Sequence, residues 1–281
     1  MTGETLAPGV AIVGCGLVGQ KRAHALGPAR LIACADERRD RAEALARSHG
    51  AAATDDWRAA VGRPDVAVVI VSTTNDALVP VTLAAVRAGK HVLVEKPAAR
   101  RADDLDEVMA VARARRVLVR VGFNHRYHPA FRKARELFDA GALGTLMFVR
   151  ARYGHGGRLG YENEWRADPA LSGGGELIDQ GVHVIYLARW FLGDITEVQG
   201  FARTYFWPMP VDDNAFLLLR TADERAAMVH VSCTEWKNLF SFEIYGRAAK
   251  LHIEGLGGSY GVERLVFHRM MPEMGPPETT V

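Results

Sequence analysis

The sequence predicts a doubly wound α/β domain with a parallel sheet, followed by an α+β domain whose large open sheet is mostly antiparallel. In the first 122 residues, short β-branched runs alternate with longer amphipathic stretches, the pattern of a parallel sheet flanked by helices. After about residue 195, strand-like runs follow one another with little helical spacing between them. A chain of 281 residues is long enough for two domains, which we place at 1–122 and 123–281.

The elements of the first domain follow from apolar patterning. Buried parallel strands should be almost continuously apolar, and such runs are Val10–Val13, Leu31–Ala35, Val66–Val71, His91–Val94 and Val117–Val121. Helical spacing lies between them, over Leu17–Leu26, Arg38–Ser48, Leu78–Ala88 and Ala102–Arg115.

The second domain is predicted to begin with a helix over Pro129–Ala140 and a strand over Leu146–Tyr153. Residues 153–175 are polar and glycine-rich, which predicts a long loop of the kind that is usually functional in a compact domain. A helix over Glu176–Phe191 follows. The remaining predicted elements are strands over Glu197–Phe206, Ala215–Thr221, Ala226–Thr234, Phe240–Tyr245, Lys250–Ile253 and Val262–Met270, and an exposed Pro-rich extension over Met271–Val281.

Composition excludes several classes of function. Lys and Arg number 35 against 33 Asp and Glu, so no broad basic surface is available for nucleic acid. The three cysteines lack metal-ligand spacing, so we expect no metal and read them as reduced thiols in apolar segments. No basic leader precedes a long apolar stretch, and no run approaches the ~18 apolar residues of a membrane span. We therefore expect a cytoplasmic protein.

A GxGxxG motif lies directly after the first predicted strand and before a helix. Gly14 allows the tight turn, Gly16 lets the backbone approach a pyrophosphate, and Gly19 permits close packing of helix against strand. This context predicts a Rossmann domain that binds a dinucleotide through the turn residues Gly14, Gly16, Leu17, Val18 and Gly19.

Asp36 ends the second predicted strand at about the ~20-residue spacing expected for a ribose-binding acid. Such an acid accepts hydrogen bonds from the adenosine ribose and repels a 2′-phosphate, which favours NAD over NADP. Two alternatives stay open. Arg38 and Arg39 could bind a phosphate instead, and Asp36 could be a solvated helix cap.

Lys96 lies in the segment Glu95-Lys96-Pro97, at the carboxyl end of a predicted strand, where open α/β sheets bind ligands. A lysine there can reach a reacting oxygen and exchange a proton, although a plain surface lysine is the structural alternative.

Asp179 and His183 are four residues apart and share a helix face after the run Ser172–Gly175. The carboxylate could orient the imidazole or share a substrate hydroxyl, whereas a lone helical histidine is more often a packing residue.

Together these residues resemble the Gfo/Idh/MocA oxidoreductases, a family named for glucose–fructose oxidoreductase and inositol dehydrogenase. The resemblance spans nearly the whole chain and rests on Val13–Gly19, Ser72–Asn75, Ala88–Pro97, Val121–Pro129 and Gly173–His183. It implies an NAD(P)-dependent enzyme that transfers a hydride between the nicotinamide and a secondary alcohol of a sugar, polyol or sugar derivative. One departure is Leu78, since the family usually carries a histidine three residues after the position of Asn75.

The resemblance also implies roles for individual residues. His183 would be the general base, with Asp179 and Lys96 completing the proton network; whether His183 or Lys96 takes the proton stays open. Asn75 matches a family position near the nicotinamide and Asn124 one near the substrate, while ordinary turn chemistry is an equal alternative for both. Cofactor contacts are also expected from Arg38, Ser72, Thr73, Glu95 and Lys96, and sugar contacts from Tyr153, Trp165 and Arg166, whose structural alternative is loop packing.

Two alternative functions are an NAD-dependent glycoside hydrolase of the same family and a non-catalytic dinucleotide-sensing regulator.

The predicted C-terminal sheet carries apolar residues that alternate along its strands, such as Phe216 and Leu218, and Val229 and Val231. An open sheet with two apolar faces needs cover on both. In the family a neighbouring subunit provides that cover, so we expect a homodimer or homotetramer formed through this sheet.

Overall fold

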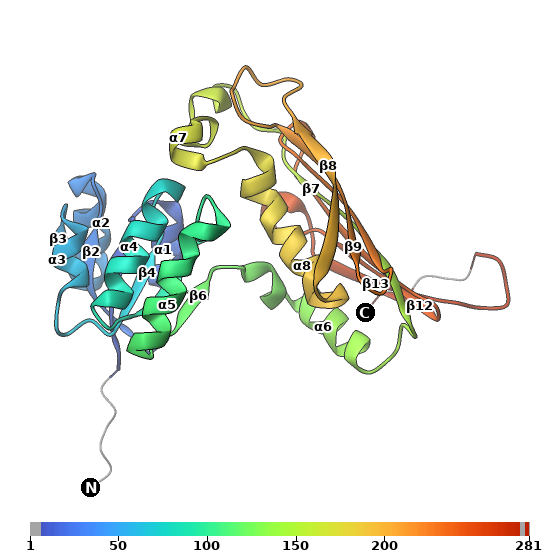
Figure 1. The fold of residues 1–281 in the computed structure, drawn as a ribbon, viewed down its shortest axis with the longest axis horizontal. Helices are drawn as coiled ribbons and strands as arrows, with labels where there is room; N and C mark the ends of the chain where they lie inside the picture. The colour runs from blue at the N-terminus through green and yellow to red at the C-terminus, as the bar shows by residue number, and fades with distance from the viewer. Residues whose placement is uncertain (1–6, 276–278, 281) are drawn as a thin grey trace, which may run out of the picture. The chain divides into compact units, whose positions relative to one another are not determined.

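The computed structural model describes residues 7–275 and 279–280, and the chain divides into two compact units (Figure 1). The first unit comprises the residues up to Gly122 together with the short segment Ala170–Gly173. The second comprises Phe123–Pro169 and the residues from Gly174 onward. Within the described residues, no helix is both long and apolar enough to cross a membrane.

The first unit is built on a parallel sheet with strand order β3-β2-β1-β4-β5-β6 among the described residues. The order reverses between β1 and β4, and ligands of open α/β sheets bind beside the carboxyl ends of the strands at such a point. The strands are β1 (Gly9–Val13), β2 (Arg30–Ala35), β3 (Ala52–Thr54), β4 (Val68–Val71), β5 (His91–Val94) and β6 (Val119–Val121). Five predicted strands are confirmed. Strand β3 was not predicted, because a short run of two alanines and a threonine has no apolar pattern.

Helices cover both faces of this sheet. Helices α1 (Leu17–His24) and α2 (Arg39–His49) pack on one face, and α3 (Trp57–Val61), α4 (Asn75–Arg87) and α5 (Asp106–Arg115) pack on the other. Helix α3 was not predicted, and α4 begins at Asn75 rather than at the predicted Leu78. The helix predicted over Ala102–Arg115 is wrong in its first turn, because Ala102–Leu105 forms the 3-10 turn η1 before α5 begins.

The second unit contains a sheet with strand order β14-β13-β12-β11-β7-β10-β9-β8 in the described residues. Among the strands that the structure describes in this sheet, only β7 and β10 pair in parallel, so the predicted mostly antiparallel sheet is confirmed. The strands are β7 (Leu146–Gly154), β8 (Ile195–Arg203), β9 (Asn214–Thr221), β10 (Ala226–Ser232), β11 (Leu239–Gly246), β12 (Ala249–Glu254), β13 (Arg264–Arg269) and β14 (Thr279–Thr280).

Two predictions in this unit are wrong in part. β8 ends at Arg203 rather than at Phe206, because the Asp213 carboxylate accepts the backbone N–H groups of residues 205–207 and turns the chain away from the strand. The tail is an exposed, irregular extension over 271–275, as predicted, but Thr279–Thr280 forms the strand β14, in which Thr279 pairs with Phe267 of β13. Residues 276–278 and 281 of that prediction lie outside the described residues.

Helices α6 (Pro129–Asp139) and α8 (Val182–Leu192) lie on the same side of this sheet (Figure 1) and bury one of its faces. Val229 and Val231 point into that core. Alternate residues point to the opposite face because side chains of a strand alternate. That face exposes large apolar side chains, which include Phe148, Phe201, Phe216, Leu218 and Met228.

The predicted loop over 153–175 is partly helical, which the glycine-rich composition did not reveal. It contains the 3-10 turns η3 (Tyr161–Asn163) and η4 (Trp165–Ala167) and the short helix α7 (Pro169–Ser172). The helix predicted over Glu176–Phe191 begins with a π-helical turn, η5 (Leu177–Gly181), and continues as α8. Such π turns occur frequently at functional sites.

Candidate active site

The GxGxxG turn is tightly packed on one side and open on the other. Gly14 has a φ of +91°, and a Cβ there would lie 2.4 Å from the carbonyl oxygen of Ser72. A Cβ at Gly19 would lie 2.1 Å from the carbonyl oxygen of Gly14, to which the Ser72 Oγ also donates at 2.7 Å. A Cβ at Gly16 would meet no heavy atom within 4 Å. The open side of the turn, at the start of α1, therefore fits a pyrophosphate.

Asp36 lies beside this turn at the end of β2. Its carboxylate accepts the backbone N–H of Cys15 at 2.7 Å and that of Arg38 at 2.9 Å. This fixed carboxylate suits ribose hydroxyls. The alternative in which Arg38 and Arg39 bind a 2′-phosphate has less support, because Arg38 already forms an ion pair with Asp40 at 2.8 Å. Arg39 likewise pairs with Glu43, at 3.0 Å. Leu17 and Val18, in the first turn of α1, are exposed, as expected for contacts with a ligand.

The segment Ser72–Asn75 organises the end of β4. Thr73 Oγ1 donates to the neighbouring Thr74 carbonyl at 3.0 Å. Asn75 is buried, and its Nδ2 donates to the Ser172 carbonyl at 2.9 Å. The amide of Asn75 thus holds the segment 170–173 within the first unit. Leu78 is fully buried in the core of this unit, so apolar packing takes the place of the family's histidine.

Lys96 follows β5 in a tight turn and is half-buried rather than fully exposed. Its neighbour Glu95 forms an ion pair with Arg22 of α1. The backbone N–H of Ala98, a residue with a φ of +73°, donates to the Glu95 carbonyl at 3.0 Å. The turn that carries Lys96 is therefore held at several points.

His183 lies in the first turn of α8, with only 5% of its surface exposed. Its ring is 4.0 Å from the ring of His125, 6.0 Å from that of Phe123 and 6.2 Å from that of Tyr153. Sequence reasoning missed His125, which is also buried, and singled out its neighbour Asn124 instead. The Oδ1 of Asn124 lies 3.2 Å from His125 Nδ1, so both residues belong to the surroundings of His183. The only sequence signal for His125 was its place inside the motif Val121–Pro129.

Asp179, in the π-helical turn, accepts a hydrogen bond from Arg166 Nε at 3.1 Å. Arg166 also lies 3.5 Å from Glu164 and covers the Trp165 ring at 4.8 Å. Burial opposes the charge of the Arg166 guanidinium, but Asp179, Tyr161 and Glu164 together outweigh burial and raise the pKa of Arg166. The structure therefore brings together Asp179, Trp165 and Arg166, whereas the four-residue spacing in the sequence paired Asp179 only with His183.

Tyrosines line the same region. Burial raises the pKa of Tyr153 above its ordinary value and raises that of Tyr260 to about 12, so both phenols remain neutral at neutral pH. Glu176 is 2% exposed and accepts a hydrogen bond from the Tyr161 hydroxyl at 3.0 Å. Its carboxylate lies 3.3 Å from Nε2 of His155. Neutral donors and buried acceptors of this kind suit a ligand that carries hydroxyl groups.

The glycine run before Asp179 serves a packing role that was not predicted. A Cβ at Gly175 would lie 1.8 Å from the carbonyl oxygen of Asp212. The Asp212 carboxylate accepts the N–H of Gly175 at 2.9 Å and that of Leu177 at 2.8 Å. At this position, glycine lets the chain pass the protein's own backbone.

Two family models match the chain. The NAD-binding Rossmann-fold domain of the Gfo/Idh/MocA oxidoreductases matches residues 9–123, and the Gfo/Idh/MocA C-terminal domain matches residues 131–252. The chain belongs to the Gfo/Idh/MocA family. Membership accounts for the pairing of a Rossmann unit with a second unit built on a large open sheet.

This family member is similar to several named proteins. It is 27% identical to levoglucosan dehydrogenase of Pseudarthrobacter phenanthrenivorans over 73% of this chain and 60% of that protein. It is 31% identical to inositol 2-dehydrogenase 2 of Saccharopolyspora erythraea over 79% of this chain and 65% of that protein. The crystal structure of GenD2 from gentamicin A biosynthesis in complex with NAD matches with a TM-score of 0.81 and 29% identity, over 96% of this chain and 74% of that one. The chain thus spans less than two thirds of the length of these two curated relatives.

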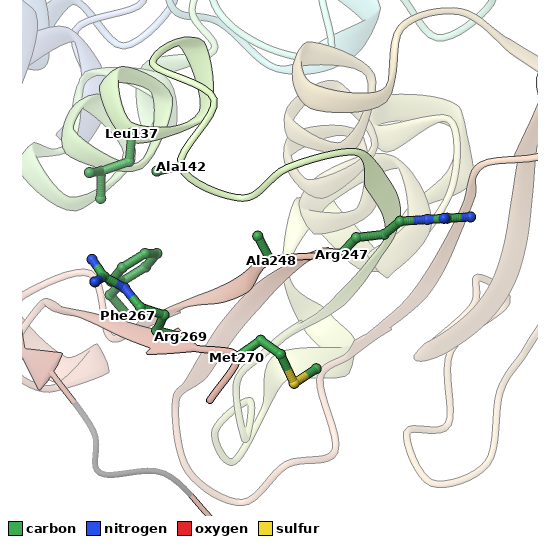
Figure 2. Close-up of a pocket in the computed structure, with 7 residues that line it drawn as sticks. All are labelled: Leu137, Ala142, Arg247, Ala248, Phe267, Arg269 and Met270. Atoms are coloured by element: carbon green, nitrogen blue, oxygen red, sulfur yellow. The ribbon is translucent and has the colours of Figure 1, made fainter. Parts of the chain in front are cut away.

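A cavity of about 550 Å³ opens in the second unit of this Gfo/Idh/MocA protein (Figure 2). It lies between the end of α6, the turn that precedes β12, and β13. No predicted cofactor or substrate residue lines it; the lining residues are Leu137, Ala142, Arg247, Ala248, Phe267, Arg269 and Met270.

Proposed function

We propose that this protein is an NAD-dependent oxidoreductase that transfers a hydride between the nicotinamide and a secondary alcohol of a sugar or polyol. The observation that carries the proposal is the buried cluster around His183, with Asp179 in the preceding turn of the same helix. The names of two relatives, levoglucosan dehydrogenase and inositol 2-dehydrogenase, point to the same class of alcohol.

The residues present fit NAD. The open side of the glycine turn at Gly16 leaves room for the pyrophosphate, and Asp36 offers a fixed carboxylate to the adenosine ribose. When bound, NAD supplies the hydride acceptor or donor of the reaction. The preference for NAD over NADP is supported by Asp36 and by the carboxylate partner that Arg38 already has. In this proposal, residues 1–122 form the nucleotide-binding domain and residues 123–281 form the substrate domain.

The chain's own residues then handle the proton. His183 accepts the proton of the substrate hydroxyl, because imidazole is the most common general base of enzymes and this one lies beside the rings of His125 and Tyr153. Lys96 of the first unit acts in the same proton transfer. Asp179, held by Arg166, presents an acceptor to a substrate hydroxyl. Asn124, Tyr153 and Trp165 complete the substrate surroundings, and Ser72, Thr73, Asn75 and Glu95 support the cofactor side.

The exposed face of the C-terminal sheet supports a second part of the proposal, a homodimer or homotetramer. Phe216 and Leu218 on β9 and Met228 on β10 form an apolar patch on the face opposite to the one that α6 and α8 bury. Contiguous exposed apolar patches of this kind mark interaction sites. We therefore assign this face to subunit contacts.

The test begins with a screen of polyols and sugars, monitored by NADH absorbance. On the substrate found, Lys96→Ala and His183→Ala should each lower kcat by about 10² to 10⁴, while NAD affinity measured by fluorescence stays near wild type. Asp179→Asn should fall between them and wild type. Because these residues act as a unit, the double variant Lys96→Ala/His183→Ala should lose much less than the product of the single losses.

Lys133→Ala is the matched control, since Lys133 pairs with Glu136 on the exposed side of α6. Near-normal turnover of either single variant would return that residue to a structural role. Bond cleavage without release of NADH would favour the glycoside hydrolase instead. Binding of NAD with no turnover of any substrate in the screen would favour the regulator.

A further inference from the structure

An ion pair joins the helix of the glycine turn to the turn that carries Lys96. Arg22 lies three residues after Gly19 in α1, and its Nε donates to Glu95 Oε1 at 2.5 Å. The Arg22 side chain is 25% exposed and the Glu95 side chain 13%, whereas the Arg38–Asp40 pair is 61% and 67% exposed. Solvent and salt weaken shielded pairs less than exposed ones. Water and salt therefore screen the Arg22–Glu95 pair less than the Arg38–Asp40 pair.

The Glu95 carboxyl group is confined from a second direction. A Cβ at Gly122, directly after β6, would lie 2.7 Å from Glu95 Oε2 and 3.0 Å from its Cδ. Gly122 is itself fixed, because its N–H donates to the Val94 carbonyl at 2.8 Å. Only glycine leaves this slot free, so the carboxyl group lies between α1 on one side and the end of β6 on the other.

The backbone of Glu95 is fixed as well. Its N–H donates to the Val71 carbonyl at 2.9 Å, and its carbonyl accepts the N–H of Ala98 at 3.0 Å. Main chain and side chain of the residue directly before Lys96 are thus both held. Since consecutive Cα atoms are ~3.8 Å apart, a displacement of Glu95 also displaces Lys96.

Glu95, the residue directly before Lys96, has its charge balanced by the ion pair with Arg22. An unpaired Glu95 carboxylate would stabilise the ammonium form of the neighbouring lysine.

We propose that Arg22 is a positioning residue that acts through Glu95, in the slot left by Gly122, to place Lys96 and keep its proton exchangeable. The proposal rests on the proposed role of Lys96 in proton transfer. It assigns a function to a contact between the cofactor helix and the lysine turn.

The experiment compares Arg22→Ala, Arg22→Lys and Gly122→Ala with wild type. Arg22→Ala and Gly122→Ala should each lower kcat by about 10- to 100-fold, the scale of a misplaced catalytic group, with NAD affinity within about threefold of wild type. Arg22→Lys should recover part of the loss because it keeps the charge. Lys21→Ala is the control, since Lys21 is the exposed neighbour on α1.

The pH profile separates positioning from mere support of the fold. In Arg22→Ala, the acid limb of the kcat profile should move to higher pH, because the uncovered Glu95 carboxylate holds the lysine proton more firmly. Adding Glu95→Gln should return the limb to its wild-type pH. If Arg22→Ala does not fold, the double variant Arg22→Gln/Glu95→Gln keeps a hydrogen-bonded neutral pair. The acid limb of its kcat profile should stay at the wild-type pH, and its kcat should exceed that of Glu95→Gln alone.

The outcomes also separate this proposal from the proposed function. Wild-type kcat and pH profile in both Arg22→Ala and Gly122→Ala, with Lys96→Ala impaired, would overturn the positioning role alone. A near-normal Lys96→Ala would overturn the role of Lys96, and the positioning role with it. Equal losses of kcat in Arg22→Ala and in Arg22→Ala/Glu95→Gln, with an unmoved pH profile, would reduce the pair to a support of the fold.

Discussion

Glu243→Gln should make folding stability depend less on pH. Glu243 lies on β11, and its side chain is 7% exposed. Its carboxylate accepts hydrogen bonds from Lys250 Nζ at 2.8 Å and from the Tyr245 hydroxyl at 2.9 Å, and it forms an ion pair with Arg150. A buried carboxylate with three donors should be strongly stabilised in its charged form.

The magnitude follows from the pKa of Glu243. Burial alone would raise this pKa, but the donors on Arg150, Lys250 and Tyr245 outweigh burial and lower it from 4.5 to about 2. At ~1.36 kcal/mol for each pH unit between the two values, the charged form contributes about 3 kcal/mol at neutral pH. Because the Arg150 side chain is 46% exposed and screened by water, we expect about half of this, ~1.5 kcal/mol.

The sign follows from the lowered pKa. The stabilisation is complete above the unfolded pKa of 4.5 and is lost as the pH falls toward the folded pKa of about 2. Urea unfolding at one protein concentration should therefore find Glu243→Gln less stable than wild type at pH 7, with a smaller difference at pH 3. Glu197→Gln, which removes a carboxylate that is 51% exposed, is the control and should change little at either pH. A difference that is the same at pH 7 and pH 3 would refute the reasoning.

Two further variants test the cofactor and the assembly. Asp36→Ala removes the carboxylate that would repel a 2′-phosphate, so a preference for NAD of at least tenfold, worth ~1.4 kcal/mol, should largely disappear in fluorescence titrations; equal binding of NAD and NADP by the wild type would contradict the assignment. Leu218→Lys, on the uncovered face of the C-terminal sheet, should convert the sedimenting oligomer to monomer, whereas Val198→Lys on the opposite face of neighbouring β8 should not. A wild-type protein that is monomeric at micromolar concentration would rule out the subunit contact.

Features that depend on neighbouring positions in the chain were predictable. The motif around Gly14 and the acid at Asp36 follow from strand–turn–helix order, and five of the strands in the first unit follow from continuous apolar runs. Strand β3 was not predictable, because three residues with small side chains at a sheet edge carry no apolar pattern. The π-helical start of the helix at Leu177 was equally hidden, because apolar spacing does not distinguish a π turn from an α turn.

The sequence by itself determined the two kinds of sheet, the glycine turn, the acid beside it and the lysine at a strand end. Each of these depends on the period of one element or on the order of adjacent elements. Only the tertiary structure decided that Arg22 meets Glu95, that His125 lies against His183, and that Arg166 holds Asp179. Spacing along the chain shows which residues share a face of one element, but partners on different elements are brought together only when the backbone packs and each side chain meets whatever charge or ring lies within its reach.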